Sequence, residues 1–198
     1  MKKVILLGDS IREWYTLKVR DILADKGIEI IWQPHDNGRF AAYSYAQLSG
    51  LLKEHGKVDL VHFNTGYWDM NKAPFIDEYN FPPEEYVFYL RKIIRLSRAA
   101  GAKVVFATTT PLPGKKVDAA DNTGTNVDFS FENNSVLLYN NAALELMKEE
   151  NVPVNDLYAI CKKHENYYKC EDNLHHTPEG NQVLAEAVAA FILKELGE

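Results

Sequence analysis

The chain has 198 residues, 46% of them hydrophobic, and a formal net charge of −6 at pH 7. This length suits one α/β domain with a sizeable core, and no linker or internal repeat divides residues 1–198. An acidic chain with scattered lysines lacks the electrostatic footprint of a protein that binds nucleic acid or an anionic membrane. No apolar run approaches membrane-spanning length, and residues 4–7 are too few for a signal peptide. We therefore expect a cytoplasmic protein, unless a leader has been removed.

Short apolar runs alternate with amphipathic segments along the whole chain. Continuous apolar runs are typical of buried parallel strands, and they lie at residues 4–7, 27–32, 58–63, 103–108 and 152–154. Helical periodicity follows each of them, at residues 11–22, 45–52, 82–94, 137–146 and 177–192. This alternation implies βαβ units and a sheet covered on both faces. We predict a three-layer α/β/α sandwich around a five-stranded parallel sheet, of the flavodoxin-like type.

Boundary signals support these segments. Pro82-Pro83-Glu84-Glu85 opens a helix, because proline is tolerated in the first turn and acidic residues suit the positive end of the dipole. Thr177 is a suitable N-cap for the last helix, with Pro178 at its first position. Residues 111–133 are rich in Gly, Pro, Asp and Asn, and we expect a long loop there that serves as a lid.

Ser10 directly follows the first predicted strand, in Gly8-Asp9-Ser10. It should lie at the carboxyl end of that strand, where open α/β sheets bind their ligands. Gly8 allows a sharp bend, and the amides at a helix amino terminus can receive a developing negative charge. Taken alone, however, this stretch is more typical of a serine that only caps a helix.

A second candidate pair lies just before the last predicted helix. Asp172 and His175 are three residues apart in a predicted loop, so the carboxylate can hold the imidazole and fix its tautomer. His175 could then deprotonate a serine hydroxyl, which is a poor nucleophile without a base. Either residue alone would be an ordinary loop residue. His176 is the alternative base, although its spacing from Asp172 does not fit.

Together these residues resemble the SGNH (GDSL-type) hydrolase family over nearly the whole chain. Four segments follow the order of the family: Gly8-Asp9-Ser10, Asn37-Gly38-Arg39, Asn64-Thr65-Gly66-Tyr67-Trp68-Asp69 and Asp172-Asn173-Leu174-His175. The resemblance implies a single domain with the SGNH hydrolase fold. It also implies Ser10 as the nucleophile, His175 as the base and Asp172 as its acidic partner. We expect no cofactor and no metal.

The resemblance also assigns an oxyanion hole, in which the N–H groups of Ser10 and Gly38 act as donors. The third donor of the family is the Asn of Gly-x-Asn-Asp, but Trp68 stands at that position in this chain. Three arrangements are open. Trp68 offers its indole N–H, Asn64 supplies its amide instead, or the third donor is missing. Loss of one donor typically costs about 2.7–4 kcal/mol of transition-state stabilisation.

These assignments predict a serine ester hydrolase that transfers an acyl group to water. We expect Arg12, Arg39 and Tyr67 near the mouth of the site, where they suit a sugar or another polar alcohol, although they could also cover the core. Family members that resemble this chain include carbohydrate acetylesterases. We therefore favour removal of an acetyl or other short acyl group from a small-molecule or glycan ester.

Other classes of function stay open. A lysophospholipase or thioesterase would use the same residues on a different substrate. A non-catalytic carbohydrate-binding relative is favoured by Trp68 but not by the joint presence of Ser10, Asp172 and His175. A phosphate-binding flavodoxin-like domain would need a glycine-rich cradle with a lysine. Cys161 and Cys170 resemble no metal-ligand framework, and the redox environment would decide whether they form a disulfide. The sequence gives no oligomeric state.

Overall fold

The centre of the protein is a five-stranded parallel sheet. The computed structural model describes residues 1–72, 76–113, 116–119, 129–164, 172 and 174–198. The strand order is β2-β1-β3-β4-β7 and every neighbouring pair is parallel. The strands are β1 (Lys2–Gly8), β2 (Ile28–Ile31), β3 (Leu60–Asn64), β4 (Lys103–Ala107) and β7 (Val154–Asn155). The predicted fold class and all five predicted strands are therefore confirmed, with a shorter last strand.

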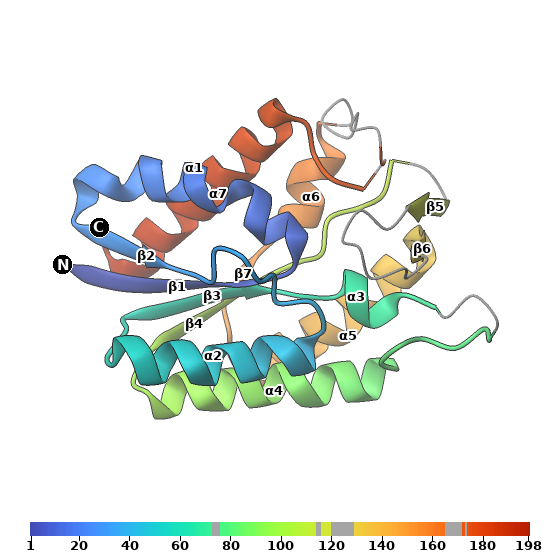
Figure 1. Ribbon diagram of the computed structural model, residues 1–198, viewed down its shortest axis with the longest axis horizontal. Helices are drawn as coiled ribbons and strands as arrows, with labels where there is room; N and C mark the ends of the chain where they lie inside the picture. The colour runs from blue at the N-terminus through green and yellow to red at the C-terminus, as the bar shows by residue number, and fades with distance from the viewer. Residues whose placement is uncertain (73–75, 114–115, 120–128, 165–171, 173) are drawn as a thin grey trace.

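Helices cover both faces of this sheet (Figure 1). One face carries α1 (Ser10–Leu23), α6 (Leu157–Lys162) and α7 (Pro178–Leu196). The other face carries α2 (Ala41–His55), α4 (Pro83–Ala99) and α5 (Asn133–Glu149). A 3-10 turn, η1 (Ala24–Lys26), follows α1, and the short helix α3 (Tyr67–Met70) follows β3. None of the described helices is both long enough and apolar enough to span a lipid bilayer.

The position of β1 inside the core explains its continuous apolar run. Val4, Ile5, Leu6 and Leu7 of β1 are each at most 1% exposed, because helices lie above and below the strand. The central strands β3 and β4 pack in the same way, as the edge-to-face contact of Phe63 and Phe106 shows. A parallel sheet buried on both faces needs such continuous apolar runs.

The loop predicted at residues 111–133 contains an unexpected pair of strands. β5 (Lys116–Ala119) and β6 (Phe129–Glu132) form an antiparallel two-stranded sheet in which Lys116 lies opposite Glu132. The expectation of a continuous loop was wrong, because two four-residue strands amid Gly, Asp and Asn give little periodic signal. Phe131 anchors β6 by an edge contact with Tyr67. Residues 114–115 and 120–128 of the predicted lid lie outside the described residues.

The helix termini follow the predicted signals closely. The Thr177 side chain accepts a hydrogen bond from the Gly180 N–H at 3.1 Å, and Pro178 occupies the first turn of α7. Cys161 is buried in α6, whereas Cys170 lies outside the described residues, so the structure does not decide between two thiols and a disulfide.

Gly8 provides a test of the close packing at the end of β1. Its φ is +148°, and a Cβ there would lie 2.3 Å from two oxygens of Asn64. We expect Gly8→Ala to lower the free energy of unfolding by about 2–5 kcal/mol, because overpacking and backbone strain add together. Urea denaturation followed by circular dichroism measures the change.

The matched control is Gly50→Ala in α2. A Cβ at Gly50 meets no atom within 4 Å, so this variant should be about 0.5–1 kcal/mol more stable than the parent. A Gly8 variant as stable as the Gly50 variant would contradict the packing described here.

Candidate active site

The turn between β1 and α1 leaves the Ser10 hydroxyl available for chemistry. Asp9 is the N-cap of α1, and its Oδ1 accepts a hydrogen bond from the Ile11 N–H at 3.0 Å. Ser10 is therefore not the capping residue. Its Oγ instead lies 2.7 Å from Nε2 of His175.

The three predicted catalytic residues form one hydrogen-bonded chain. His175 Nε2 faces Ser10 Oγ, and on the other side of the ring Nδ1 lies 2.5 Å from Oδ2 of Asp172. The second oxygen of Asp172 accepts hydrogen bonds from the backbone N–H groups of Leu174 (2.9 Å) and His175 (3.0 Å). Both carboxylate oxygens are thus held, so the His175 ring has a fixed orientation toward Ser10. This is the geometry of a nucleophile, a base and the group that orients the base.

The electrostatics of Asp172 suit this role. Partial burial raises the pKa of its carboxyl group, but the hydrogen bonds from the His175 ring and from the N–H groups of Leu174 and His175 outweigh burial and lower it below the usual range. Asp172 therefore stays ionised near neutral pH. An ionised partner can stabilise the imidazolium that forms when His175 takes a proton.

Trp14 completes the surroundings of the base. Its ring stacks on the His175 ring with centroids 4.8 Å apart and planes 11° apart, while the residue stays 49% exposed. The sequence analysis did not select Trp14. Its position four residues after Ser10 was the available signal, because residues four apart share one face of a helix.

Two residues predicted to contact substrate are buried instead. Arg12 is 0% exposed, and its Nη2 donates to the Gly8 carbonyl oxygen at 3.1 Å. Tyr67 is 2% exposed, and its hydroxyl donates to the Thr110 carbonyl oxygen at 2.6 Å. Placing both at the mouth was wrong, because each side chain satisfies a backbone carbonyl inside the protein. Arg39 is the exception, since its guanidinium is partly exposed, lies over the Tyr43 ring and pairs with Asp36.

Gly38 packs directly against the turn that carries Ser10. Its N–H donates to the Gly8 carbonyl oxygen at 2.6 Å, and a Cβ at this position would lie 2.4 Å from Ser44 Oγ. Only glycine fits this close approach. The predicted role of this N–H as an oxyanion donor stays a prediction, and it requires sharing or replacing the bond to Gly8.

The two alternative third donors lie in different surroundings. Asn64 ends β3 with 1% exposure, and its side-chain oxygen has no hydrogen-bond partner among the described residues. Trp68 is partly buried in α3 and makes an edge contact with Phe40. The next residue, Asp69, joins this segment to α2, because its Oδ1 accepts from the Ala41 N–H at 3.0 Å. The identity of the third donor stays a prediction.

His176 does not face the nucleophile. It is 1% exposed, and its Nε2 lies 3.7 Å from Sγ of Cys161 in α6. Burial, together with the charge of His175, lowers the pKa of His176 to about 4, so this ring is neutral near pH 7. Of the two neighbouring histidines, His175 is the one placed to act as a base on Ser10.

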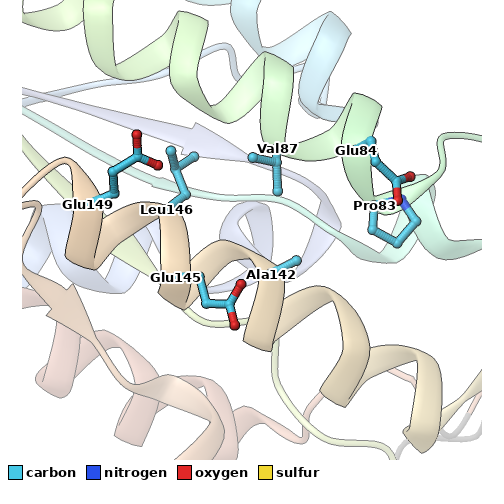
Figure 2. Close-up of a pocket in the computed structure, with 7 residues that line it drawn as sticks. All are labelled: Pro83, Glu84, Val87, Ala142, Glu145, Leu146 and Glu149. Carbon is cyan, nitrogen blue, oxygen red and sulfur yellow. The ribbon is translucent and has the colours of Figure 1, made fainter.

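Other features of the structure do not add to this site. Within the described ranges, no cluster of three or more His, Cys, Asp or Glu side chains is arranged to hold a metal ion. A groove between α4 and α5 (Figure 2) lies on the opposite face of the sheet from α1 (Figure 1). Its lining combines glutamates with apolar residues and proline: Pro83, Glu84, Val87, Ala142, Glu145, Leu146 and Glu149. It contains none of the triad residues.

Comparisons with known proteins place this geometry in context. No family model and no curated protein sequence matches the chain. The lipase/acylhydrolase from Enterococcus faecalis is similar in structure, with a TM-score of 0.74, 19% identity and coverage of 98% of this chain and 97% of that chain. An acetyl xylan esterase is also similar, with a TM-score of 0.72, 19% identity and coverage of 96% of this chain and 99% of that chain.

A third similar structure decides the fold. A GDSL-like lipase from Bacteroides thetaiotaomicron has a TM-score of 0.73 and 16% identity, and the match covers 98% of this chain and 89% of that chain. The chain has the SGNH hydrolase fold. This is the fold that the resemblance of the four sequence segments implied. In this SGNH fold, Ser10 follows the first strand of the sheet and the Asp172–His175 pair precedes the last helix.

The buried carboxyl group of Asp9, next to Ser10, allows a test based on the pH dependence of stability. Burial raises the pKa of its carboxyl group to about 6, although the Ile11 N–H and the charge of Arg12 oppose the rise. The folded protein therefore binds more protons at Asp9 than the unfolded chain does between about pH 4 and 6. The protonated Asp9 carboxyl group therefore contributes to the free energy of unfolding at low pH, and this contribution is lost as the pH rises through about 6.

We expect Asp9→Asn to remove this dependence while keeping an oxygen that caps α1. Relative to the parent, the variant should gain about 2–3 kcal/mol in free energy of unfolding between pH 4 and pH 7. Denaturant titrations at both pH values measure the difference. A constant difference across this range would contradict the buried, proton-binding state of Asp9.

Proposed function

We propose that the protein is a serine ester hydrolase. The observation that carries this proposal is the continuous hydrogen-bonded chain from Ser10 Oγ through His175 to Asp172, with links of 2.7 and 2.5 Å. A purely structural serine needs no base, and a carbohydrate-binding module needs no oriented imidazole beside a hydroxyl. The SGNH fold supports the same conclusion, because the similar structures are named as esterases and acylhydrolases.

The geometry supports acyl transfer in two steps. His175 Nε2 takes the proton of Ser10 while Oγ attacks the ester carbonyl carbon, and Asp172 stabilises the resulting imidazolium. The imidazolium then protonates the leaving alcohol, which departs and leaves an acyl group on Ser10. Water enters next to His175, loses a proton to it and attacks the acyl group. The bond between the acyl carbon and Oγ then breaks, the carboxylic acid departs, and His175 returns the proton to Ser10 Oγ.

The N–H of Ser10 is the oxyanion donor with the strongest support. It lies at the amino end of α1, where backbone amides lack acceptors within the helix and the helix dipole favours negative charge. Gly38 and a side chain from the Asn64–Asp69 segment are the remaining candidates for this role. The departure from the family at Trp68 predicts a slower esterase rather than an inactive protein, because one missing donor reduces the rate without removing the nucleophile or the base.

The fold neighbours and the partly exposed Arg39 support a proposal for the substrate class. We infer that the preferred substrate carries an acetyl or another short acyl group on a carbohydrate or similar polar alcohol. An acetyl xylan esterase is among the similar structures, and the partly exposed Arg39 offers hydrogen-bond donors to hydroxyl groups.

A longer acyl chain is the second candidate. Two of the similar structures are named as a lipase/acylhydrolase and a GDSL-like lipase, which supports a lysophospholipid or a similar acyl ester as the alternative substrate. Hydrolysis rates for acetyl, butyryl and octanoyl esters of one alcohol, measured beside an acetylated xylose, separate the two candidates. A preference for octanoyl esters would reject the short-chain assignment.

Ser10→Ala tests the nucleophile directly. We expect kcat for ester hydrolysis to fall by at least about 10³-fold, since only binding and oxyanion stabilisation remain. The parent should be labelled at Ser10 by a fluorophosphonate, and the variant should not be labelled at all. Ser49→Ala, an exposed position in α2, is the matched control and should keep both activity and labelling. Unchanged turnover in the Ser10 variant would reject the mechanism.

Asp172→Asn tests the partner of the base. The amide can still accept the N–H groups of Leu174 and His175, but it carries no charge to stabilise the imidazolium. We expect kcat to fall by about 10³–10⁴-fold with little change in KM. Initial-rate kinetics on a short aryl ester measure both constants, and a fully active variant would contradict the assigned role of Asp172.

A further inference from the structure

Trp14 lies at the boundary between the triad and solvent. One surface of its indole stacks on the His175 ring, with centroids 4.8 Å apart, yet 49% of the residue is exposed. Of the exposed large apolar side chains in the described part of the chain, Trp14 is the one with a ring contact to a triad residue. Leu17, three residues further along α1, is similarly exposed at 51%.

The proposed reaction determines which part of a substrate passes this indole. The acyl carbon bonds to Ser10 Oγ, whereas the departing alcohol oxygen receives its proton from His175 Nε2. That oxygen must therefore come within hydrogen-bond distance of Nε2. Since the indole lies against the same imidazole, it adjoins the alcohol part of the ester and not the end of the acyl chain.

We propose that Trp14 binds the alcohol part of the substrate by packing its exposed indole surface against the flat face of a six-membered ring. This inference rests on the proposed esterase function and goes on to assign a specificity residue for the leaving group. A flat aromatic surface gains most from a flat partner, because contact area and ring electrostatics both depend on close parallel approach. The axial C–H groups of a sugar ring offer such a face, while its hydroxyl groups stay directed toward water.

The experiment compares acetate esters that share the acyl group and differ in the alcohol. Cyclohexyl acetate carries a saturated ring, isopropyl acetate is a secondary alcohol ester without one, and a monoacetylated methyl xyloside carries a sugar ring. We expect the parent to have a higher kcat/KM for both ring esters than for isopropyl acetate. Trp14→Ala should lower each ratio of ring ester to isopropyl ester by about tenfold, mainly through KM.

Two further variants separate ring recognition from other effects. Trp14→Phe keeps an aromatic face and should retain each ratio within about threefold of the parent. Leu17→Ala removes a similarly exposed side chain from the same helix and should leave the ratios unchanged. The ratio of butyrate to acetate hydrolysis for a single alcohol should also stay constant in Trp14→Ala, since the acyl group lies elsewhere.

The outcomes distinguish this inference from the proposed function. Absence of any ester hydrolysis in the parent would reject the esterase assignment itself. Equal losses for ring and isopropyl esters in Trp14→Ala would show that the indole only holds the imidazole, and would overturn ring recognition. If Trp14→Ala lost the preference for cyclohexyl acetate but kept the preference for the xyloside acetate, the proposal that Trp14 binds a sugar ring would be overturned.

Discussion

The carbonyl oxygen of Gly8 is the point at which the segments of the site are joined. It accepts the Gly38 N–H at 2.6 Å and the Arg12 guanidinium at 3.1 Å. These bonds tie the end of β1 to the loop before α2 and to the first turn of α1. Both glycines are required, because a Cβ on either would overlap neighbouring oxygens. Ser10 follows two residues after this carbonyl, so the position of the nucleophile depends on a close approach of backbones rather than on side-chain packing.

Three ionisable side chains are buried in the interior near Ser10. Asp9, Arg12 and Asp69 are all 0% exposed, and burial shifts the pKa of Asp9 and Asp69 upward and that of Arg12 downward. Burial of charged groups is expensive unless they are paired and hydrogen-bonded. Each here makes a bond that fixes the backbone, to the Ile11 N–H, to the Gly8 carbonyl and to the Ala41 N–H respectively. These three bonds hold the backbone of the turn before α1 and the start of α2, as a preorganised site requires.

The sequence was sufficient for the features that local pattern controls. The apolar run Val4–Leu7 predicted a buried strand, and the Asp172–His175 spacing predicted a carboxylate held against an imidazole. It was insufficient where tertiary packing decides the direction of a side chain. Arg12 and Tyr67 lie close to predicted loops in the sequence, which suggested surface positions. In the folded chain, each side chain points inward and donates a hydrogen bond to a backbone carbonyl oxygen. Trp14 was missed for the same reason, because its partner His175 lies at the other end of the chain. The β5–β6 pair was missed because its short strands stabilise each other across a segment of weak periodicity.

The alignment of base and nucleophile depends on two helices that share one face of the sheet. Ser10 is the first residue of α1, and His175 precedes α7 by only a short loop whose end is fixed by the Thr177 cap. α1 and α7 pack side by side (Figure 1), with fully buried residues such as Val19 and Val188 in the two helices. A shift of either helix would change the distance between Oγ and Nε2 directly. The stack of Trp14 on His175 adds a contact between α1 and the loop that carries the base, so one helix positions the nucleophile and also restrains the base that activates it.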